Sequence, residues 1–249
     1  MIRILTAYHF QPKPGEAVEN DVYRPLVLPV RDPLATHDPI MEENSFAEMR
    51  AHHWAQLNWE SGVTHYGFQH YRRWFLLEPF GLGRTRFALN VVSRTTFDSI
   101  LATLRPMPRE RQEALSAWAQ PLEIVAAMPV NLYSDLAAQF VEVHGIEPWR
   151  ALLAALDEIK WDGPRNARVF YPGNMFIIRP EPFALYMTFW REVMRLLSPV
   201  LKPERGTYQE RIFGFLSERL WTLWLLRNRR TGAFGVTHVP VLHCAEWTG

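Results

Sequence analysis

The order of apolar and polar positions along the chain predicts strands that alternate with helices. Residues 2–8 are apolar and rich in β-formers and predict a first strand, and residues 64–71 alternate with a period of two and predict a second. Four further apolar runs have strand length, at residues 122–128, 168–171, 175–179 and 236–243. Each run is bounded by proline, glycine or a charged residue, as strands in a compact protein commonly are.

Seven segments repeat their apolar positions with the helical period of 3.6 residues, at residues 44–61, 93–104, 108–118, 132–144, 148–159, 181–197 and 208–227. Strands and helices in this order predict an α/β fold, with a largely parallel or mixed sheet flanked by helices. In such sheets ligands bind beyond the carboxyl ends of the strands. Candidate chemistry is therefore sought where the predicted strands end.

One stretch of the chain shows neither the strand period of two nor the helical period of 3.6 residues. Residues 11–43 contain Pro25, Pro29, Pro33 and Pro39 and predict a long proline-rich loop. A loop of this length in a compact domain usually serves function. We expect the whole chain, residues 1–249, to form one domain that carries this loop.

Composition narrows the class of protein. The chain has 249 residues, 48% hydrophobic and 21% charged, which suits a globular domain. A net charge of +1 argues against a nucleic-acid partner, so any anion site must be a local cluster of basic residues. A single cysteine, Cys244, forms no intrachain disulfide, and the chain opens without an apolar run long enough for a signal peptide or a membrane span. We therefore expect a cytoplasmic protein.

The strongest chemical signal follows the second predicted strand. His70, Tyr71, Arg72, Arg73 and Trp74 are consecutive, and two arginines beside a histidine can bind phosphate oxygens through paired donors. A solvated basic edge with Trp74 in the core explains the same residues equally well.

The first predicted strand ends in a similar polar group. Thr6 and His9 lie where that strand stops, so the fold rule brings them toward the same edge as the second strand's cluster. Residues 6–9 are therefore candidates for contact with a ligand.

A third candidate lies on the predicted helix at residues 208–227. Arg211, Gly214 and Glu218 share one helical face, and the glycine would allow the arginine and the carboxylate to approach each other. Glu218 held over a cavity could act as a general base. The spacing alone favours the other interpretation, a buried glutamate paired with an arginine as a structural clamp.

Two weaker candidates remain. Asn174 follows Gly173 in a turn that could offer its amide to a ligand, although such turns are also ordinary. Glu48 stands three residues after Ser45, the spacing of a capping box at a helix start. His52 and His53 follow on the same helix, but no cysteine or aspartate completes a metal site, and none is assigned.

Absent motifs shape the hypothesis as well. The chain has no phosphate-binding glycine loop and no Asp-x-Asp, the pair that holds a divalent ion on the diphosphate in many nucleotide-sugar transferases. A bound diphosphate would then depend on cationic side chains. No cofactor is firmly implied, and a divalent metal is unsupported by the sequence.

Four separated segments together resemble one family. They comprise Glu48, Trp54 and Asn58; residues 66–75, with His-Tyr-Arg-Arg-Trp-Phe at their end; residues 173–178; and Arg211 with residues 214–220. In this order they resemble a family of glycosyltransferases from capsular and exopolysaccharide gene clusters, formerly of unknown function. The resemblance extends over residues 2–243, and the His-Tyr-Arg-Arg strand is its most specific part.

The resemblance implies a GT-A-like α/β domain that transfers a hexose, including galactofuranose, from a nucleotide-diphosphate sugar. The acceptor would be a glycan or a lipid-linked glycan, and the enzyme could sit peripherally at the cytoplasmic membrane face, through that acceptor or through a polysaccharide-assembly partner. The alternatives are a phosphoribosyl or sugar-phosphate transferase, and a non-catalytic sugar- or nucleotide-binding subunit of an assembly complex.

The hypothesis assigns a role to each candidate residue. Arg72 and Arg73 neutralise the leaving diphosphate, His70 positions or protonates it, and Glu218 is the base if the reaction inverts. The remaining residues are expected to contact the donor or acceptor: Thr6, His9, Glu48, Tyr71, Asn174 and Arg211.

Overall fold

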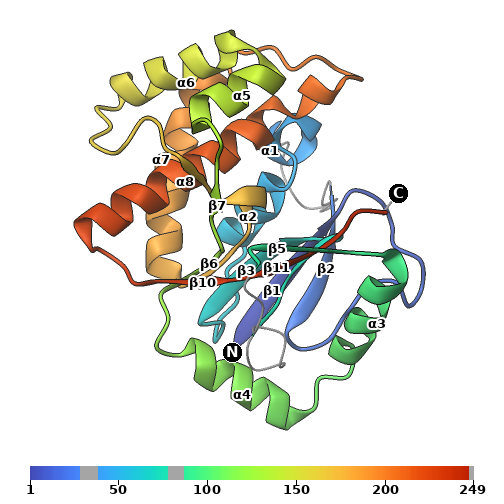
Figure 1. Ribbon diagram of the computed structural model, residues 1–249. Coiled ribbons are helices and arrows are strands. Elements are labelled where there is room, and N and C mark those ends of the chain that lie inside the picture. The colour runs from blue at the N-terminus through green and yellow to red at the C-terminus, as the bar shows by residue number, and fades with distance from the viewer. Residues whose placement is uncertain (29–38, 78–86, 247–249) are drawn as a thin grey trace.

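The computed structural model describes residues 1–28, 39–77 and 87–246. Within these residues the chain forms a central mixed sheet with helices on both faces, which confirms the predicted α/β class (Figure 1). The part of the proline-rich segment at residues 29–38, with Pro29 and Pro33, lies outside the described residues.

Nine strands of the described residues form the central sheet. They are β1 (Ile2–Tyr8), β2 (Tyr23–Val27), β3 (His65–His70), β4 (Arg73–Phe75), β5 (Leu89–Val92), β6 (Ile124–Ala127), β9 (Phe176–Ile178), β10 (Val236–Val239) and β11 (Val241–Cys244). The order β10-β6-β9-β3-β4-β11-β5 forms the main path, and β1 lies between β3 and β2. A short antiparallel pair, β7 (Val130–Asn131) and β8 (Val169–Phe170), lies apart from it.

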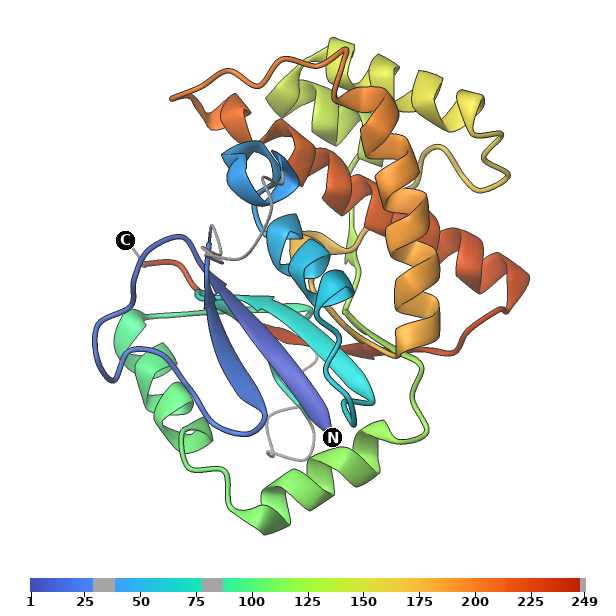
Figure 2. The same cartoon turned by 180° about the vertical axis from the view of Figure 1, so that it is seen from behind.

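Helices cover the two faces unequally (Figures 1 and 2). One face carries α3 (Arg94–Leu104) and α4 (Arg109–Ala119). The other carries α2 (Met49–Leu57), α5 (Leu136–His144), α6 (Ile146–Glu158), α7 (Pro180–Leu197) and α8 (Ile212–Thr231). The short α1 (Pro39–Glu42) precedes α2, and single 3-10 turns, η1 (Asn44–Phe46), η3 (Pro172–Asn174) and η4 (Tyr208–Arg211), precede α2, β9 and α8.

Successive side chains of a strand point to opposite faces of the sheet, so the apolar core is divided between these two faces. In β1, Leu5 packs into the cluster beneath α7 and α8, whereas Ile4 packs into the cluster with α3 and α4. In β3, Tyr66 and Phe68 both join the first cluster. Every residue of β3 is buried, so the strand is covered on both faces, as expected of a central strand.

The predicted elements are largely confirmed, and the misses have physical causes. Strand β2 lies inside the segment expected to be irregular, and it contains Pro25. It pairs in the described sheet with β1 alone, and an edge strand tolerates a proline because its missing N–H is not needed on the outer side. The last predicted strand is two strands, β10 and β11, which separate at Pro240.

Residues 220–225, within the helix predicted at residues 208–227, are the buried centre of α8. Over the part of the chain that the structure describes, none of the helices combines the length and the apolarity needed to cross a bilayer.

Candidate functional site

Two strand ends meet at one edge of the sheet, as the sequence predicted. Strands β1 and β3 are parallel, and Ala7 is paired with His70. His70 is the last residue of β3 and His9 follows the end of β1, so their rings lie 5.5 Å apart. His70 is buried and His9 is exposed, so this edge is open to solvent on the His9 side.

Glu48 reaches the same edge from the start of α2, where a helix cap was expected. The predicted capping box is wrong: the Glu48 side chain makes no capping hydrogen bond, and the Ser45 hydroxyl donates to Glu43. Between them Ala47 has φ 46° and ψ −127°, a backbone conformation that a residue with a Cβ rarely adopts. This break separates η1 from α2 and frees Glu48 to face the two histidines.

Close contact with α8 fixes the Ala47 backbone. A Cβ added to Gly214 would lie 2.7 Å from the Ala47 Cβ, so only glycine fits there without a shift. From the sequence, Gly214 was expected to allow Arg211 and Glu218 to approach each other. Its observed role is to let α8 approach the turn that presents Glu48.

The Ala47–Gly214 contact leads to a stability prediction. Replacing Gly214 by alanine favours the helix by about 1 kcal/mol, but the overlap with Ala47 costs about 1–3 kcal/mol. We expect a net loss of thermal stability in Gly214→Ala. The Ala47→Gly/Gly214→Ala double variant removes the overlapping methyl and should recover most of the loss in a melting experiment. A Gly214→Ala melting temperature equal to the parent's would contradict the contact.

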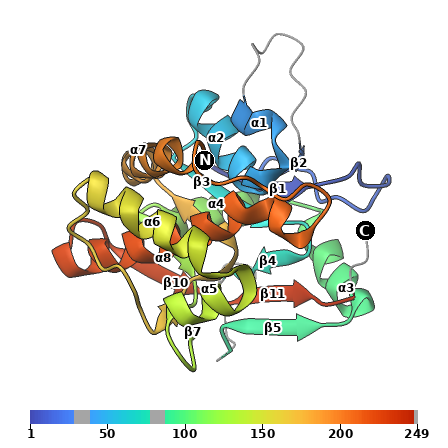
Figure 3. The same cartoon turned by 90° about the horizontal axis from the view of Figure 1, so that it is seen from above.

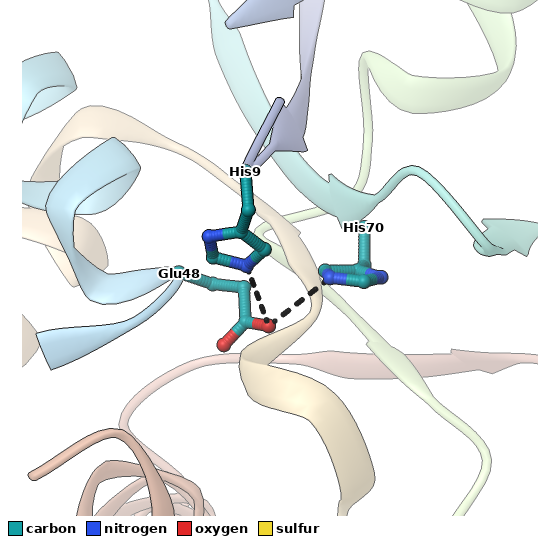
Figure 4. A group of neighbouring side chains, drawn as sticks. All are labelled: His9, Glu48 and His70. Carbon is teal, nitrogen blue, oxygen red and sulfur yellow. Dashed lines mark ion pairs between the residues drawn. The ribbon is translucent and has the colours of Figure 1, made fainter. Parts of the chain in front are cut away.

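His9, Glu48 and His70 form a compact cluster around one carboxylate oxygen. Glu48 Oε1 lies 3.6 Å from His9 Nε2 and 3.3 Å from His70 Nε2. The three side chains converge in Figure 4, and their potential ligand atoms all lie within 4.8 Å of one another. The sequence placed His9 and His70 at one edge of the sheet, but it gave no sign that Glu48 joins them.

Burial and neighbouring charges set the protonation states in this cluster. Burial alone would raise the pKa of Glu48, but the interactions with His9, His70 and Arg211 hold it well below its ordinary value. Burial lowers the pKa of His70 well below its ordinary value, against the attraction of Glu48, and Arg73 lowers it further. At neutral pH Glu48 is therefore an anion and His70 a neutral imidazole. A neutral His70 can position a ligand, but it is a poor proton donor, which argues against the protonating role considered for it.

The two arginines follow at the tight connection between β3 and β4. His70 pairs with Arg73, so Tyr71 and Arg72 form the corner of the turn. The Arg73 guanidinium donates from Nε to His243 Nδ1 at 3.4 Å. Burial first, and then the charges of Arg73 and Arg72, lower the pKa of His243 to about 4, so its ring is neutral and can accept that bond. The sequence analysis did not single out His243, because a histidine within an ordinary C-terminal strand carries no local signal.

Arg73 also lies beside the turn that holds Glu218. A Cβ added to Gly173 would lie 3.5 Å from Arg73 Nη1, and Gly173 has φ 87°, a value that favours glycine. The Gly173 N–H donates to Glu218 Oε1 at 3.1 Å. The guanidinium, the turn and the carboxylate are thus contiguous.

Glu218 pairs with its neighbour in sequence, Arg219. Arg219 Nη1 lies 3.0 Å from Glu218 Oε2, whereas Arg211 was the expected partner. Arg211 belongs to η4 and stacks its guanidinium over Phe215, 5.3 Å from the ring centre. Burial raises the pKa of Glu218, while Arg219, Arg73 and Arg211 oppose the rise without cancelling it. A carboxylate with a raised pKa accepts a proton more readily than an ordinary one.

Two predicted contact residues are engaged within the protein instead. The Thr6 hydroxyl is buried and accepts a hydrogen bond from Gln69 Nε2 at 3.0 Å, so it ties β1 to β3. Asn174 is buried as well, and its amide donates to the Gly214 carbonyl. The Asn174 carbonyl contacts His52 Nε2 at 2.9 Å. Both side chains are held by neighbouring residues of the protein, and their role as ligand contacts stays a prediction.

Tyr71 belongs to a group of aromatic rings beside the histidines. Its ring stacks on Tyr8 at 5.8 Å, meets Phe10 edge-on at 5.0 Å and contacts His70 at 4.1 Å. Tyr71 and Phe10 are partly exposed, and such faces can stack on a nucleobase or a sugar ring. These aromatic rings border the cluster of His9, Glu48 and His70.

The fold and this edge define an α/β protein that gathers basic, acidic and aromatic side chains beyond two parallel strand ends. Residues 4–229 match the family described as Domain of unknown function (DUF4422). The chain belongs to that family, which covers nearly its whole length. No curated protein matches the chain.

Among solved structures, the chain is similar to the apo structure of the WbbM bifunctional glycosyltransferase. The TM-score is 0.71 at 17% sequence identity, and the match covers 98% of this chain. It covers 45% of WbbM, so this chain spans less than half of that protein's length. At this identity the likeness shows a shared fold. The observed arrangement of a mixed sheet between two helical layers is thus found in a glycosyltransferase.

Proposed function

We propose that the protein is a glycosyltransferase that moves a sugar from a nucleotide-diphosphate donor to a glycan acceptor. One observation carries the proposal: Arg73 lies beside both the Glu218 turn and the edge where His70 and His9 meet. Cationic and carboxylate groups thus adjoin each other where α/β folds bind ligands. The fold shared with WbbM, and the His-Tyr-Arg-Arg resemblance, support the same reaction class.

The reaction breaks the bond between the anomeric carbon and the diphosphate oxygen. The electron pair leaves with the nucleoside diphosphate, and charge grows on its phosphate oxygens. Arg73 and Arg72 offer planar donor pairs to those oxygens, and Arg211 adds a third cation near Glu48 and Glu218. Tyr71 and Phe10 would stack against the base or sugar.

The acceptor hydroxyl forms the new bond to the anomeric carbon and must lose its proton. Glu218 is the proposed base, because its buried carboxylate lies beside Arg73 and has a raised pKa. Direct displacement by the acceptor would invert the anomeric configuration. A hexose such as galactofuranose as the sugar, and a capsular or surface polysaccharide as the acceptor, are the finer parts of the proposal. Action at the cytoplasmic membrane face on a lipid-linked acceptor, with or without an assembly partner, completes it.

A donor panel tests the proposal directly. Purified protein is incubated with nucleotide-diphosphate hexoses and oligosaccharide acceptors, and product masses are recorded. We expect one donor to add a single hexose to the acceptor and to release its nucleoside diphosphate. The same nucleoside diphosphate should raise the melting temperature, because a ligand that binds the native state stabilises it.

Other product patterns contradict the proposal in different ways. A product that retains a phosphate on the transferred sugar would indicate a sugar-phosphate transferase. Stabilisation by a nucleotide sugar without turnover of any donor, across the acceptor panel, would indicate a binding subunit.

A further inference from the structure

The cluster of His9, Glu48 and His70 has the chemistry of a metal site. Two imidazole nitrogens and one carboxylate oxygen come from three separate segments, and all three lie within 4.8 Å of one another. Three protein ligands of these types, with further positions left open, are typical of catalytic transition-metal sites. The sequence analysis rejected a metal on His52 and His53, and this cluster shares neither residue.

The distances within the cluster also fit three ligands of a shared cation. Glu48 Oε1 lies 3.3 Å from His70 Nε2 and 3.6 Å from His9 Nε2, beyond the usual hydrogen-bond length. Ligand bonds of about 2.1 Å at a tetrahedral angle would separate neighbouring ligand atoms by about 3.4 Å. Both imidazoles turn toward the same Glu48 oxygen in Figure 4, and the three potential ligand atoms lie within 4.8 Å of one another.

The surroundings hold the three ligands in place and leave one side open. His70 ends a buried strand, and its ring is fixed against Tyr71 at 4.1 Å. Glu48 is presented by the Ala47 turn, which Gly214 contacts. His9 is exposed, so a cation could enter from solvent and keep open positions toward an incoming ligand.

We propose that His9, Glu48 and His70 form a binding site for one divalent transition-metal ion, with open coordination positions directed toward a phosphate ligand. Two imidazoles favour Zn²⁺, Co²⁺ or Mn²⁺ over Mg²⁺ and Ca²⁺, which prefer oxygen ligands. This site would replace the missing Asp-x-Asp by a different ligand set.

Neighbouring cations predict that the ion binds together with a diphosphate. The positive charge of Arg211 lowers the pKa of Glu48, and the charges of Arg73 and Arg72 lower the pKa of His70. A divalent cation bound here without an anion would therefore be repelled by these arginines. An anionic diphosphate would neutralise both the ion and the arginines. This second part rests on the proposed function, whereas ion binding by the three residues does not.

Direct titration of the metal tests the site without any enzymatic assay. Co²⁺ is added to the full chain and followed by visible absorption, and Zn²⁺ is counted by elemental analysis after dialysis. We expect one ion per chain, with affinity reduced at least about a hundredfold in His9→Ala, because loss of a ligand costs more than loss of a supporting contact. His9 is exposed, so this variant should fold.

His144→Ala is the matched control. His144 lies on α5, where it contacts Gln209 and stacks on Phe215, away from the cluster. We expect it to bind the ion as the parent does, and Glu48→Gln to bind as weakly as His9→Ala. Equal binding by His9→Ala and His144→Ala, or no stoichiometric binding by the parent, would overturn the site.

A second titration separates the two proposals. Co²⁺ is titrated again with UDP, GDP or ADP at saturating concentration, and we expect at least one to tighten ion binding by about tenfold or more, within the usual range of coupling between sites. Ion binding that no diphosphate strengthens would uphold the metal site and contradict the diphosphate at this edge. Donor turnover that persists in EDTA, with no ion bound by the parent, would uphold the transferase and overturn the metal site.

Discussion

Replacing Arg73 by alanine is expected to lower the rate of sugar transfer by about a hundredfold or more while the protein stays folded. Removal of one preorganised donor from a developing anion commonly costs about 10²–10³ in rate. Arg73 adjoins several groups of the site: His243, the Gly173 turn and, through its charge, Glu218 and His70. The measurement is kcat and KM with the donor found in the panel, alongside a melting curve.

Two comparison variants make the Arg73 result specific. Arg73→Lys keeps the charge but loses the planar donor pair, so we expect it to retain more activity than alanine and less than the parent. Arg109→Ala removes an exposed arginine on α4 that pairs with Glu113, and it should leave turnover unchanged. Near-normal turnover in Arg73→Ala would refute the diphosphate role of this residue.

Replacing Glu218 by glutamine is expected to reduce kcat by about 10²–10⁴, the usual contribution of a general base. Glutamine keeps the size of the side chain and an oxygen that can accept from the Gly173 N–H. It loses the negative charge that pairs with Arg219. Glu147→Gln on α6, an exposed glutamate paired with Arg150, is the matched control and should retain full activity.

The pH dependence of kcat separates a base from a structural clamp. Burial raises the pKa of Glu218 above its ordinary value of 4.5, so the carboxylate becomes protonated at a higher pH than an exposed one. As pH falls through that raised pKa, kcat should fall with it, and Glu218→Gln should lose this acidic limb. Protonation of a group whose folded pKa is raised adds stability, so this loss of rate is not unfolding caused by Glu218. An unchanged pH profile with a lowered melting temperature would identify Glu218 as a clamp only.

Most of the fold follows from local sequence, because it depends on interactions between near neighbours. Helices α3, α4, α6 and α7 bury the faces that their periodicity predicts. The strand ends at His9 and His70 meet because parallel strands end at a common edge, a rule that needs only the order of elements. The edge strand β2 was not predicted, because a proline such as Pro25 is tolerated only in a strand with one unpaired side. Whether a strand has an unpaired side depends on the rest of the sheet and is not visible in the local sequence.

The capping-box prediction failed for a reason of the same kind. Ser45 and Glu48 have the correct spacing, but α8 packs so closely on Ala47 that the chain turns there with a positive φ. A contact between residues 47 and 214 outweighs a local propensity, since helix capping contributes only about 1 kcal/mol. The turn then points Glu48 toward the histidines.

The layers of this protein, the sheet edge where polar side chains gather and the residue types at that edge can be predicted from the sequence. Which of these side chains face one another depends on tertiary packing: Glu48 faces His9 and His70, and Glu218 pairs with Arg219 in place of Arg211. Tertiary packing also turns Thr6 inward, onto Gln69. Periodicity reports which face of an element is buried, but partners in a site come from segments far apart in the chain. Their meeting depends on close packing between those segments, as Gly214 provides against Ala47.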